Sequence, residues 1–154
     1  MIVTFCGHRD ILFKNGEEKR LEDELRKVLK ESPDAVFYLG DYGKFDGLCN
    51  YTLRQLQKEY PLLRRVFVTP YLDPEYAHFQ YVDDYYDEVL YPFIEKVVKR
   101  FAISKRNQWM VNQADLVIAY VDHGWGGAAK TFEYVIHKHK RYVNLGNYVY
   151  SLSD

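Results

Sequence analysis

A glycine-rich turn in the last third of the sequence has the residue types that bind anions. The apolar, strand-like run Ala114–Val121 is followed by Gly124, Gly126 and Gly127, and then by a helical pattern from Ala128. A helix that begins directly after a glycine turn presents free backbone N–H groups and the positive end of its dipole to one point. This arrangement predicts a seat for an anion, most often a phosphate.

The next side chains extend this prediction, so we expect a phosphate to be bound by Gly124, Gly126, Gly127, Lys130 and Thr131. The segment approaches the ATP-binding pattern G-x-x-x-x-G-K-[ST], but Ala129 stands where the second glycine belongs. Little sequence follows Thr131, whereas that pattern normally precedes a strand carrying a magnesium-binding Asp. We therefore expect an anion seat without ATP hydrolysis, and a purely structural turn is the alternative.

Two further glycine turns follow predicted strands at Gly7-His8-Arg9 and at Gly40-Asp41-Tyr42-Gly43-Lys44-Phe45-Asp46. Glycine at position 7 lets the backbone approach a ligand closely. His8 and Arg9 either contact a phosphate or cap and solvate their loop. Gly43 and Asp46 are also candidate ligand residues, although Asp46 is equally interpreted as a turn or cap residue.

An arginine on an apolar helix face is a separate signal. Ile103, Arg106 and Met110 are spaced by three and four residues, so they share one face of a predicted helix. Arg106 either points into a ligand site or lays its stem on the core with its head in water. His123 is interpreted as structural, and His137 and His139 as surface residues.

These candidates are positioned by alternating strand and helix patterns. Predicted strands cover 2–6, 35–39, 65–69, 88–90, 115–121 and 141–145; predicted helices cover 17–31, 45–59, 92–99, 104–113 (capped by Ser104) and 128–139. Alternation favours parallel pairing and right-handed crossovers. We expect an α/β fold, a single doubly wound Rossmann-like domain over 1–154 with a mostly parallel sheet and a loop-rich excursion at about 71–100. In a 3-2-1-4-5 strand order the turns at Gly7 and at Gly124 to Gly127 would face each other at the sheet's switch point, with the turn after the second strand one place further out along the same edge.

Composition limits the classes of protein. The net charge is −1, which argues against a general nucleic-acid binder, so nucleic acid is possible but not favoured. Cys6 and Cys49 lack zinc-site spacing, and no pattern calls for a metal or a cofactor. No apolar run is long enough to span a membrane. We expect a cytoplasmic protein. Some of its fifteen tyrosines, or Trp125, are candidates for stacking on the flat ring of a ligand.

Taken in order, several motifs resemble the SLOG superfamily, which includes DNA-processing proteins and the LOG cytokinin-activating enzymes. Phe5-Cys6-Gly7 resembles its first turn, and Gly40 to Asp46 its second. Arg106-Asn107-Gln108-Trp109-Met110, with Ala114-Asp115, is similar to the R-K-x-x-M … S-D helix. Gly126-Gly127 and Thr131-x-Glu133 are similar to the loop P-G-G-x-G-T-x-x-E. The likeness is closest to the bacterial YpsA-like branch and covers most of the chain outside 71–100.

The resemblance implies a Rossmann-like pocket for a nucleotide, a homodimer, and catalytic roles for Arg106 and Glu133 in cleaving the bond between base and ribose phosphate. A carboxylate beside the sugar would stabilise the positive charge that builds on the ribose or activate water. The chain departs from the hydrolase pattern at two points. Trp125 replaces the proline, and Glu133 follows Thr131 by two residues rather than three, with Tyr134 at the expected position.

Three functions follow as hypotheses. The first is binding of a nucleotide or a nucleotide-derived, ADP-ribose-like small molecule, as a sensor, carrier or sink. The second is a nucleoside 5′-monophosphate N-glycosidase. The third is an interaction module for proteins or single-stranded DNA.

Overall fold

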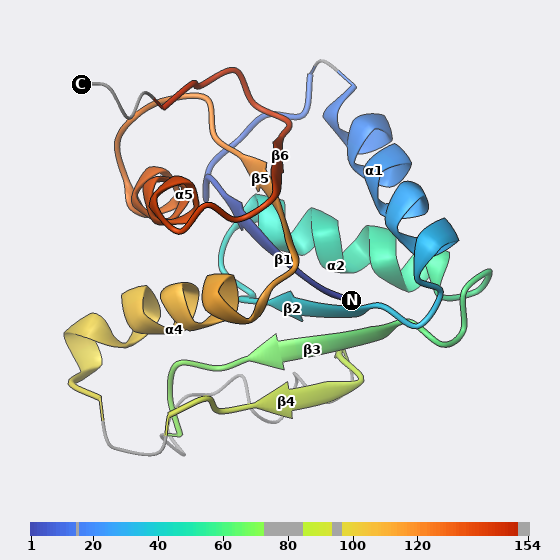
Figure 1. The fold of residues 1–154 in the computed structure, drawn as a ribbon, viewed down its shortest axis with the longest axis horizontal. Helices are drawn as coiled ribbons and strands as arrows, with labels where there is room; N and C mark the ends of the chain where they lie inside the picture. Colours follow the sequence, from blue (N-terminus) through green and yellow to red (C-terminus); the bar gives the residue numbers. More distant parts are fainter. Residues whose placement is uncertain (15, 73–84, 94–96, 151–154) are drawn as a thin grey trace.

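The computed structural model describes residues 1–14, 16–72, 85–93 and 97–150. Its centre is a six-stranded sheet in the order β4-β3-β2-β1-β5-β6, in which every pair is parallel. The strands are β1 (Ile2–Gly7), β2 (Val36–Leu39), β3 (Arg64–Val68), β4 (Glu88–Leu90), β5 (Leu116–Tyr120) and β6 (Tyr142–Asn144). The α/β, Rossmann-like prediction is therefore confirmed (Figure 1).

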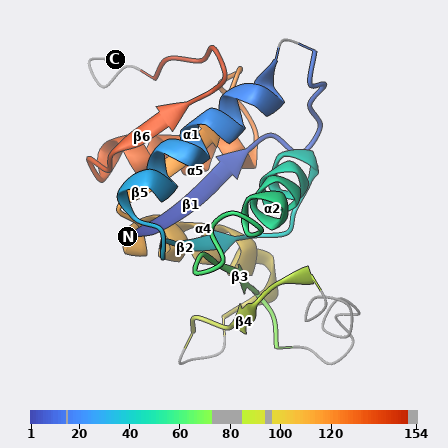
Figure 2. The same ribbon diagram turned by 90° about the vertical axis from the view of Figure 1, so that its right-hand side faces the viewer.

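Helices cover both faces of this sheet. One face packs on α1 (Glu17–Glu31) and α2 (Lys44–Leu56), and the other on α4 (Lys99–Gln113) and α5 (Gly127–His137) (Figures 1 and 2). Alternate side chains of β1 serve the two cores, since Val3 and Phe5 pack with α1 and α2 while Cys6 packs with α5. The alternation along each strand thus builds two cores from one sheet.

The strand order reverses beside β1, as the sequence predicts. β1 pairs with β2 on one side and with β5 on the other, with a register that runs from Val3↔Leu116 to Gly7↔Tyr120. Pairing continues past the strand ends, because the His8 N–H donates to the Tyr120 carbonyl at 3.2 Å. The turn after β1 and the turn after β5 therefore leave the sheet side by side.

The predicted elements between β3 and β5 need correction. The strand at Glu88–Leu90 is present, but α4 begins at Lys99 rather than at Ser104, and its N-cap Val98 makes no side-chain cap hydrogen bond. Ala102 is fully buried one turn before Arg106, so tertiary packing extends the helix upstream of the residue best suited to cap it.

The short helix predicted at 92–99 is not seen at 92–93 or 97–98, and residues 94–96 lie outside the described part, as do residues 73–84 of the expected excursion. Within the described part of the chain, no helix combines the length and apolar character needed to cross a membrane.

Candidate ligand-binding cavity

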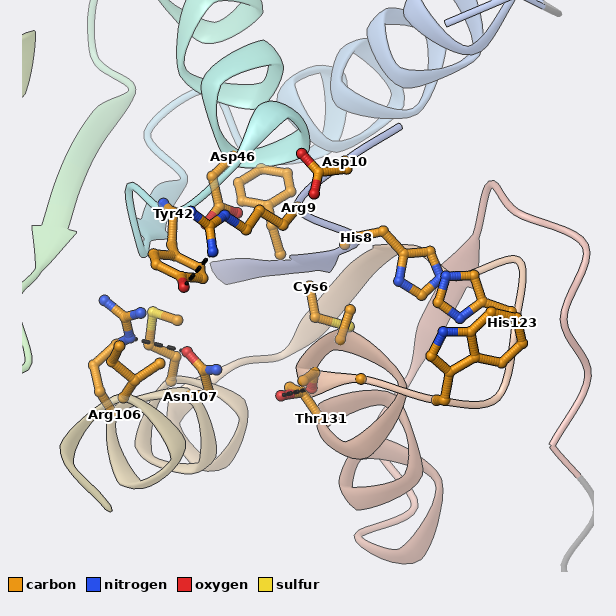
Figure 3. A pocket seen from close by; sticks show the side chains of 18 residues that line it. Cys6, His8, Arg9, Asp10, Tyr42, Asp46, Arg106, Asn107, His123 and Thr131 are labelled. Carbon is orange, nitrogen blue, oxygen red and sulfur yellow. Dashed lines mark hydrogen bonds between the residues drawn. The ribbon is translucent and has the colours of Figure 1, made fainter. Parts of the chain in front are cut away.

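A cavity of about 560 Å³ opens where the chain leaves β1 and β5. Its walls are the loop after β1, the amino ends of α2 and α5, and one face of α4 (Figure 3). Ile103, Arg106 and Met110 all line it, so the shared helix face predicted from their spacing is confirmed. The site thus lies at the carboxyl edge of the parallel sheet, beside the switch point, where open α/β sheets bind their ligands.

The amino end of α5 forms the open wall of this cavity. Gly126 has a φ of 91°, which favours glycine, and α5 begins at Gly127. A Cβ added at Gly126 or Gly127 would meet no atom within 4 Å. The first intrahelical bond runs from the Lys130 N–H to the Gly126 carbonyl, so the preceding N–H groups have no acceptor within the helix. Backbone donors and a helix dipole therefore meet at an unobstructed surface.

Of the residues expected to bind phosphate in this segment, some line the cavity and others lie outside it. Thr131 lines the cavity, and its hydroxyl donates to the Gly127 carbonyl at 3.0 Å. Lys130 is exposed and does not line the cavity. Gly124 is also outside the lining, and a Cβ there would lie 2.8 Å from the Tyr148 hydroxyl oxygen, so this glycine makes room for Tyr148.

Glu133 likewise lies outside the cavity. Its carboxylate accepts a hydrogen bond from the Tyr150 hydroxyl at 3.0 Å and lies 3.7 Å from His137 Nε2, and the side chain is exposed. The carboxylates in the cavity wall are Asp10 and Asp46. The departure in spacing between Thr131 and Glu133 therefore has a structural counterpart, because one residue rotates a helical side chain by about 100°.

The opposite wall, at the amino end of α2, is crowded by protein groups. The Arg9 guanidinium donates to the Tyr42 hydroxyl at 3.1 Å and lies 5.0 Å from the centre of the Tyr42 ring. Gly43 has a φ of 96°, and a Cβ there would lie 2.6 Å from Arg9 Cα. Gly43 does not line the cavity, so its role is to let the chain around Arg9 pack closely.

Arg106, on α4, lines the cavity and also holds neighbouring strand ends together. Its side chain is 2% exposed, and Nη1 donates to the carbonyls of Gly40 and Val68, each at 2.9 Å. Nε donates to Asn107 Oδ1 at 2.9 Å. The interpretation with a solvated guanidinium is thus wrong, because the carbonyls of Gly40, just after β2, and of Val68, the last residue of β3, hold the charged head inside the protein.

Two groups that line the cavity have pKa values shifted by burial. Asp46 Oδ2 accepts the Tyr42 N–H at 2.9 Å, and burial raises the pKa of the Asp46 carboxyl to about 6 against the lowering effect of that bond and of Arg106. Burial raises the pKa of the Cys6 thiol to about 12, so this cavity residue stays protonated and is a poor nucleophile. The cavity therefore offers a carboxyl group that titrates near neutral pH.

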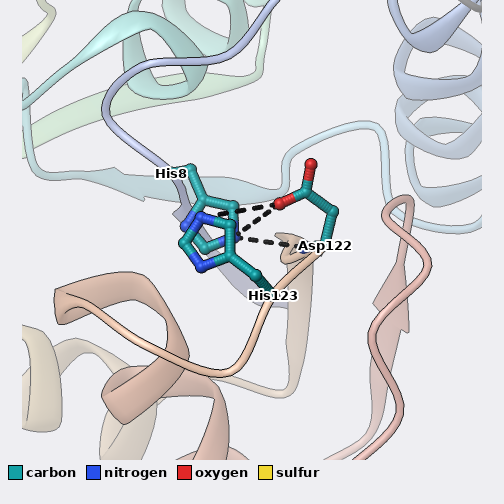
Figure 4. Close-up of side chains that lie close together, drawn as sticks. All are labelled: His8, Asp122 and His123. Carbon is teal, nitrogen blue, oxygen red and sulfur yellow. Dashed lines mark hydrogen bonds and ion pairs between the residues drawn. The ribbon is translucent and has the colours of Figure 1, made fainter.

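His8 connects the loop after β1 with the loop after β5. Its side chain is buried, and its Nε2 accepts the Asp122 N–H at 3.1 Å (Figure 4). The same atom lies 3.1 Å from Asp122 Oδ1, and His123 Nε2 lies 3.6 Å from that oxygen. His123, interpreted from sequence as structural, also lines the cavity.

Donor atoms of His8, Asp122 and His123 all lie within 4.8 Å of one another, which is a spacing that metal ligands can have. The two imidazole planes, however, are 12° from parallel with centroids 3.6 Å apart. Their in-plane lone pairs run side by side instead of converging, and His8 Nε2 already accepts an amide proton. The geometry of this cluster is therefore that of ring stacking and loop attachment.

Sequence reasoning did not name several lining residues as candidates, namely Phe5, Cys6, Asp10, Asn107 and Ala128, whereas Trp125, expected to stack on a flat ring, does line the cavity. Asn107 adjoins Arg106 on α4, so a search for polar neighbours of Arg106 would have found it. Tyr42 precedes Gly43 in the second glycine turn. An aromatic residue in a turn at this edge of the sheet could have been recognised as a candidate partner for Arg9, whose guanidinium lies over the Tyr42 ring.

Comparison with solved structures identifies the fold. DNA processing protein A from Helicobacter pylori, whose structure describes a single-stranded DNA binding mode, superposes with a TM-score of 0.61 at 15% identity over 94% of this chain and 64% of that one. DNA processing protein A (DprA) from Streptococcus pneumoniae gives 0.60 at 16% identity over 92% of this chain and 49% of that one. The structural-genomics target TM1055 gives 0.55 at 16% identity over 92% and 71%.

The chain thus spans about two thirds and one half of the two DNA processing proteins. No protein-family model and no curated protein matches the sequence. At this level of identity the structural likeness speaks for the fold alone. The chain has the Rossmann-like fold of DNA processing protein A, which is consistent with its resemblance to the SLOG superfamily.

Proposed function

We propose that the cavity binds a nucleotide or a nucleotide-derived, ADP-ribose-like ligand, with a phosphate at the amino end of α5. The observation that carries this proposal is the open surface at Gly126 and Gly127, where backbone donors have no acceptor within the helix and a Cβ would meet nothing. Arg9 and Arg106 lie in the wall with Asp10 and Asp46, so the charges there are balanced and the anion is attracted chiefly by α5.

A charge placed at this seat tests the proposal. Gly127→Asp adds a carboxylate at the first residue of α5, where the helix dipole favours it, so the fold should be retained. We expect isothermal titration calorimetry to detect AMP, ADP-ribose, ribose 5-phosphate or inorganic phosphate with the wild type, and at least tenfold weaker binding with Gly127→Asp. Gly47→Asp is the matched control, since a Cβ at Gly47 also meets nothing and Gly47 does not line the cavity. Equal affinities for the three proteins would contradict the phosphate seat.

Single-stranded DNA is a second candidate, favoured by the fold shared with a DNA processing protein whose structure describes that binding mode. A strand of DNA offers the same phosphate and base groups as a nucleotide. Fluorescence anisotropy with a labelled oligothymidylate tests it. DNA binding that falls steeply with salt and is displaced by free AMP would place both ligands in the same cavity.

The N-glycosidase hypothesis gains no support from the position of Glu133, which bonds to Tyr150 outside the cavity. Incubation with a panel of nucleoside 5′-monophosphates, followed by chromatography for free base, tests it directly. We expect binding without release of base. Release that disappears in Glu133→Ala would establish the hydrolase instead, and the homodimer implied by the resemblance is tested by light scattering on the same samples.

A further inference from the structure

Three aromatic rings form a column in one wall of the cavity. His8, from the loop after β1, stacks on His123 with centroids 3.6 Å apart, and His123 stacks on Trp125 at 3.7 Å with planes 22° apart. The last two rings come from the loop between β5 and α5. All three residues line the cavity, so the column joins the two loops of the switch point at the site itself.

The inner end of this column is held in place by hydrogen bonding and burial. His8 is 6% exposed, and its Nε2 accepts the Asp122 N–H, which fixes the orientation of the first ring. Burial and the nearby His123 lower the pKa of His8, against the raising effect of Asp122, so the ring is neutral near pH 7 and stacks without charge repulsion. A fixed first ring orients the second and third.

The outer end of the column is open. Trp125 is 71% exposed although one face of its indole contacts His123, so the exposed surface is the opposite face and the ring edge. An exposed indole that is already oriented at a cavity wall is a surface prepared for another ring, because little side-chain entropy is lost on contact. Gly127 follows Trp125 by two residues, so their Cα atoms are at most about 7.6 Å apart, within the span of one nucleotide.

We propose that Trp125 is the stacking platform for the base of the ligand, and that a base placed there extends the column by a fourth ring. The proposal rests on the proposed nucleotide function and adds the residue that receives the base. Every base has a flat face, so stacking of this kind tolerates all of them, with purines favoured by their larger area. The site should therefore require an aromatic base and accept all of them, with a modest preference for purines.

The test uses Trp125 fluorescence and affinity together. The chain has two tryptophans, and Trp109 packs on Tyr38 and does not line the cavity, so Trp109→Phe leaves Trp125 as the single tryptophan, which is excited selectively at wavelengths that tyrosine does not absorb. In this background we expect AMP and CMP to quench the emission and ribose 5-phosphate to leave it unchanged. By calorimetry, Trp125→Ala should weaken the affinity for AMP by about 5- to 150-fold and leave the affinity for ribose 5-phosphate unchanged. Trp125→Phe, which keeps an aromatic ring, should retain most of the wild-type affinity for AMP.

The outcomes separate the two proposals. If AMP binds no more tightly than ribose 5-phosphate and Trp125→Ala changes neither affinity, the platform is overturned and the phosphate seat stands. If neither ligand binds the wild type, both proposals are overturned. A thermal unfolding curve for Trp125→Ala that matches the wild type excludes a folding defect, which we expect because the side chain is exposed.

Discussion

The amino ends of α2 and α5 follow glycine turns at the same edge of the sheet, yet one is filled by protein and the other is open. At α2, Gly43 packs against Arg9, and Asp46 accepts a backbone N–H of the turn. At α5, a Cβ on Gly126 or Gly127 would meet nothing. The two glycine turns therefore differ in their surroundings: one packs closely against another backbone segment, and the other leaves an open surface, which we propose is used by a ligand.

The difference arises from which charges the fold brings to each end. The amino end of α2 lies beside the buried Arg106, which donates to carbonyls at the carboxyl ends of β2 and β3. The amino end of α5 follows a loop whose His123 stacks on Trp125 and on His8, and a Cβ on Gly126 or Gly127 would meet no atom there. Under the function proposed above, the α2 side shapes the cavity and the α5 side receives the anion.

The largest expected effect comes from a substitution on the α2 side of the cavity, which is filled by protein groups. Arg106→Met keeps the apolar stem but leaves the buried carbonyls of Gly40 and Val68 without their donor, so we expect the free energy of unfolding to fall by about 3 kcal/mol or more. Urea denaturation measures the loss. Lys105→Met, at the exposed neighbouring position, should change stability by less than about 0.5 kcal/mol. Equal losses in the two variants would show that Arg106 is not structural.

A pair of glycine substitutions sharpens the contrast between packed and open backbone. A Cβ at Gly7 would lie 2.2 Å from Phe45 Cδ2, so Gly7→Ala must displace a core ring and should cost about 1–3 kcal/mol. Gly127→Ala meets nothing and should leave stability unchanged or raise it by up to about 1 kcal/mol. Thermal and urea unfolding compare the two, and a Gly127→Ala loss as large as that of Gly7→Ala would remove the distinction.

Asp46 gives the filled side a dependence on pH. Its carboxyl has a pKa of about 6 in the folded chain against 3.8 ordinarily, so the folded state holds the proton more tightly between these values. Its contribution to stability therefore falls as pH rises from about 4 to 6 and stays at its lowest level above 6. Asp46→Asn keeps the acceptor for Tyr42 and should become progressively more stable than the wild type across that window. Urea midpoints at pH 4, 5, 6 and 7 measure the difference, and a constant difference would contradict the raised pKa.

The smallest expected effect concerns Glu133, on the outer side of α5. Its bond to Tyr150 is exposed, so Glu133→Gln should change the free energy of unfolding by less than about 0.5 kcal/mol. Ligand affinity measured by calorimetry should be unchanged, because the side chain does not line the cavity. A tenfold loss of ligand affinity in Glu133→Gln would show that Glu133 takes part in the site. So would the loss of a base-releasing activity that the wild type has.

Much of the fold could be predicted because it follows from local pattern. The alternation of apolar strands and amphipathic helices predicts parallel pairing, and the strand order around β1 and the short β4 follow that prediction. The start of α4 could not be predicted from the sequence. Ser104 is a residue type that caps helices, so it indicated a start there, but the helix extends upstream because Ala102 is buried against the rest of the fold. The side chains at 103, 106 and 110 were found from helical spacing for the same local reason.

The site was only partly predictable because a residue's type does not state its partners. Arg9, Arg106 and the glycines of three turns were candidates from sequence, but nothing in their types distinguishes Gly43, which packs, from Gly127, which is open. The stacking of His8 on His123 joins residues more than a hundred positions apart. Such a contact depends on the pairing of β1 with β5.

The order of residues along the chain, by itself, determined the alternating elements, the parallel sheet and the edge at which three glycine turns gather, since hydrophobic period and turn chemistry act over a few neighbours. Only the tertiary structure decided which turn is filled by Arg106 and Asp46, which one remains open, and that Glu133 faces outward. Burial, stacking and the partner of a charge depend on distant segments, which meet only when the sheet has formed.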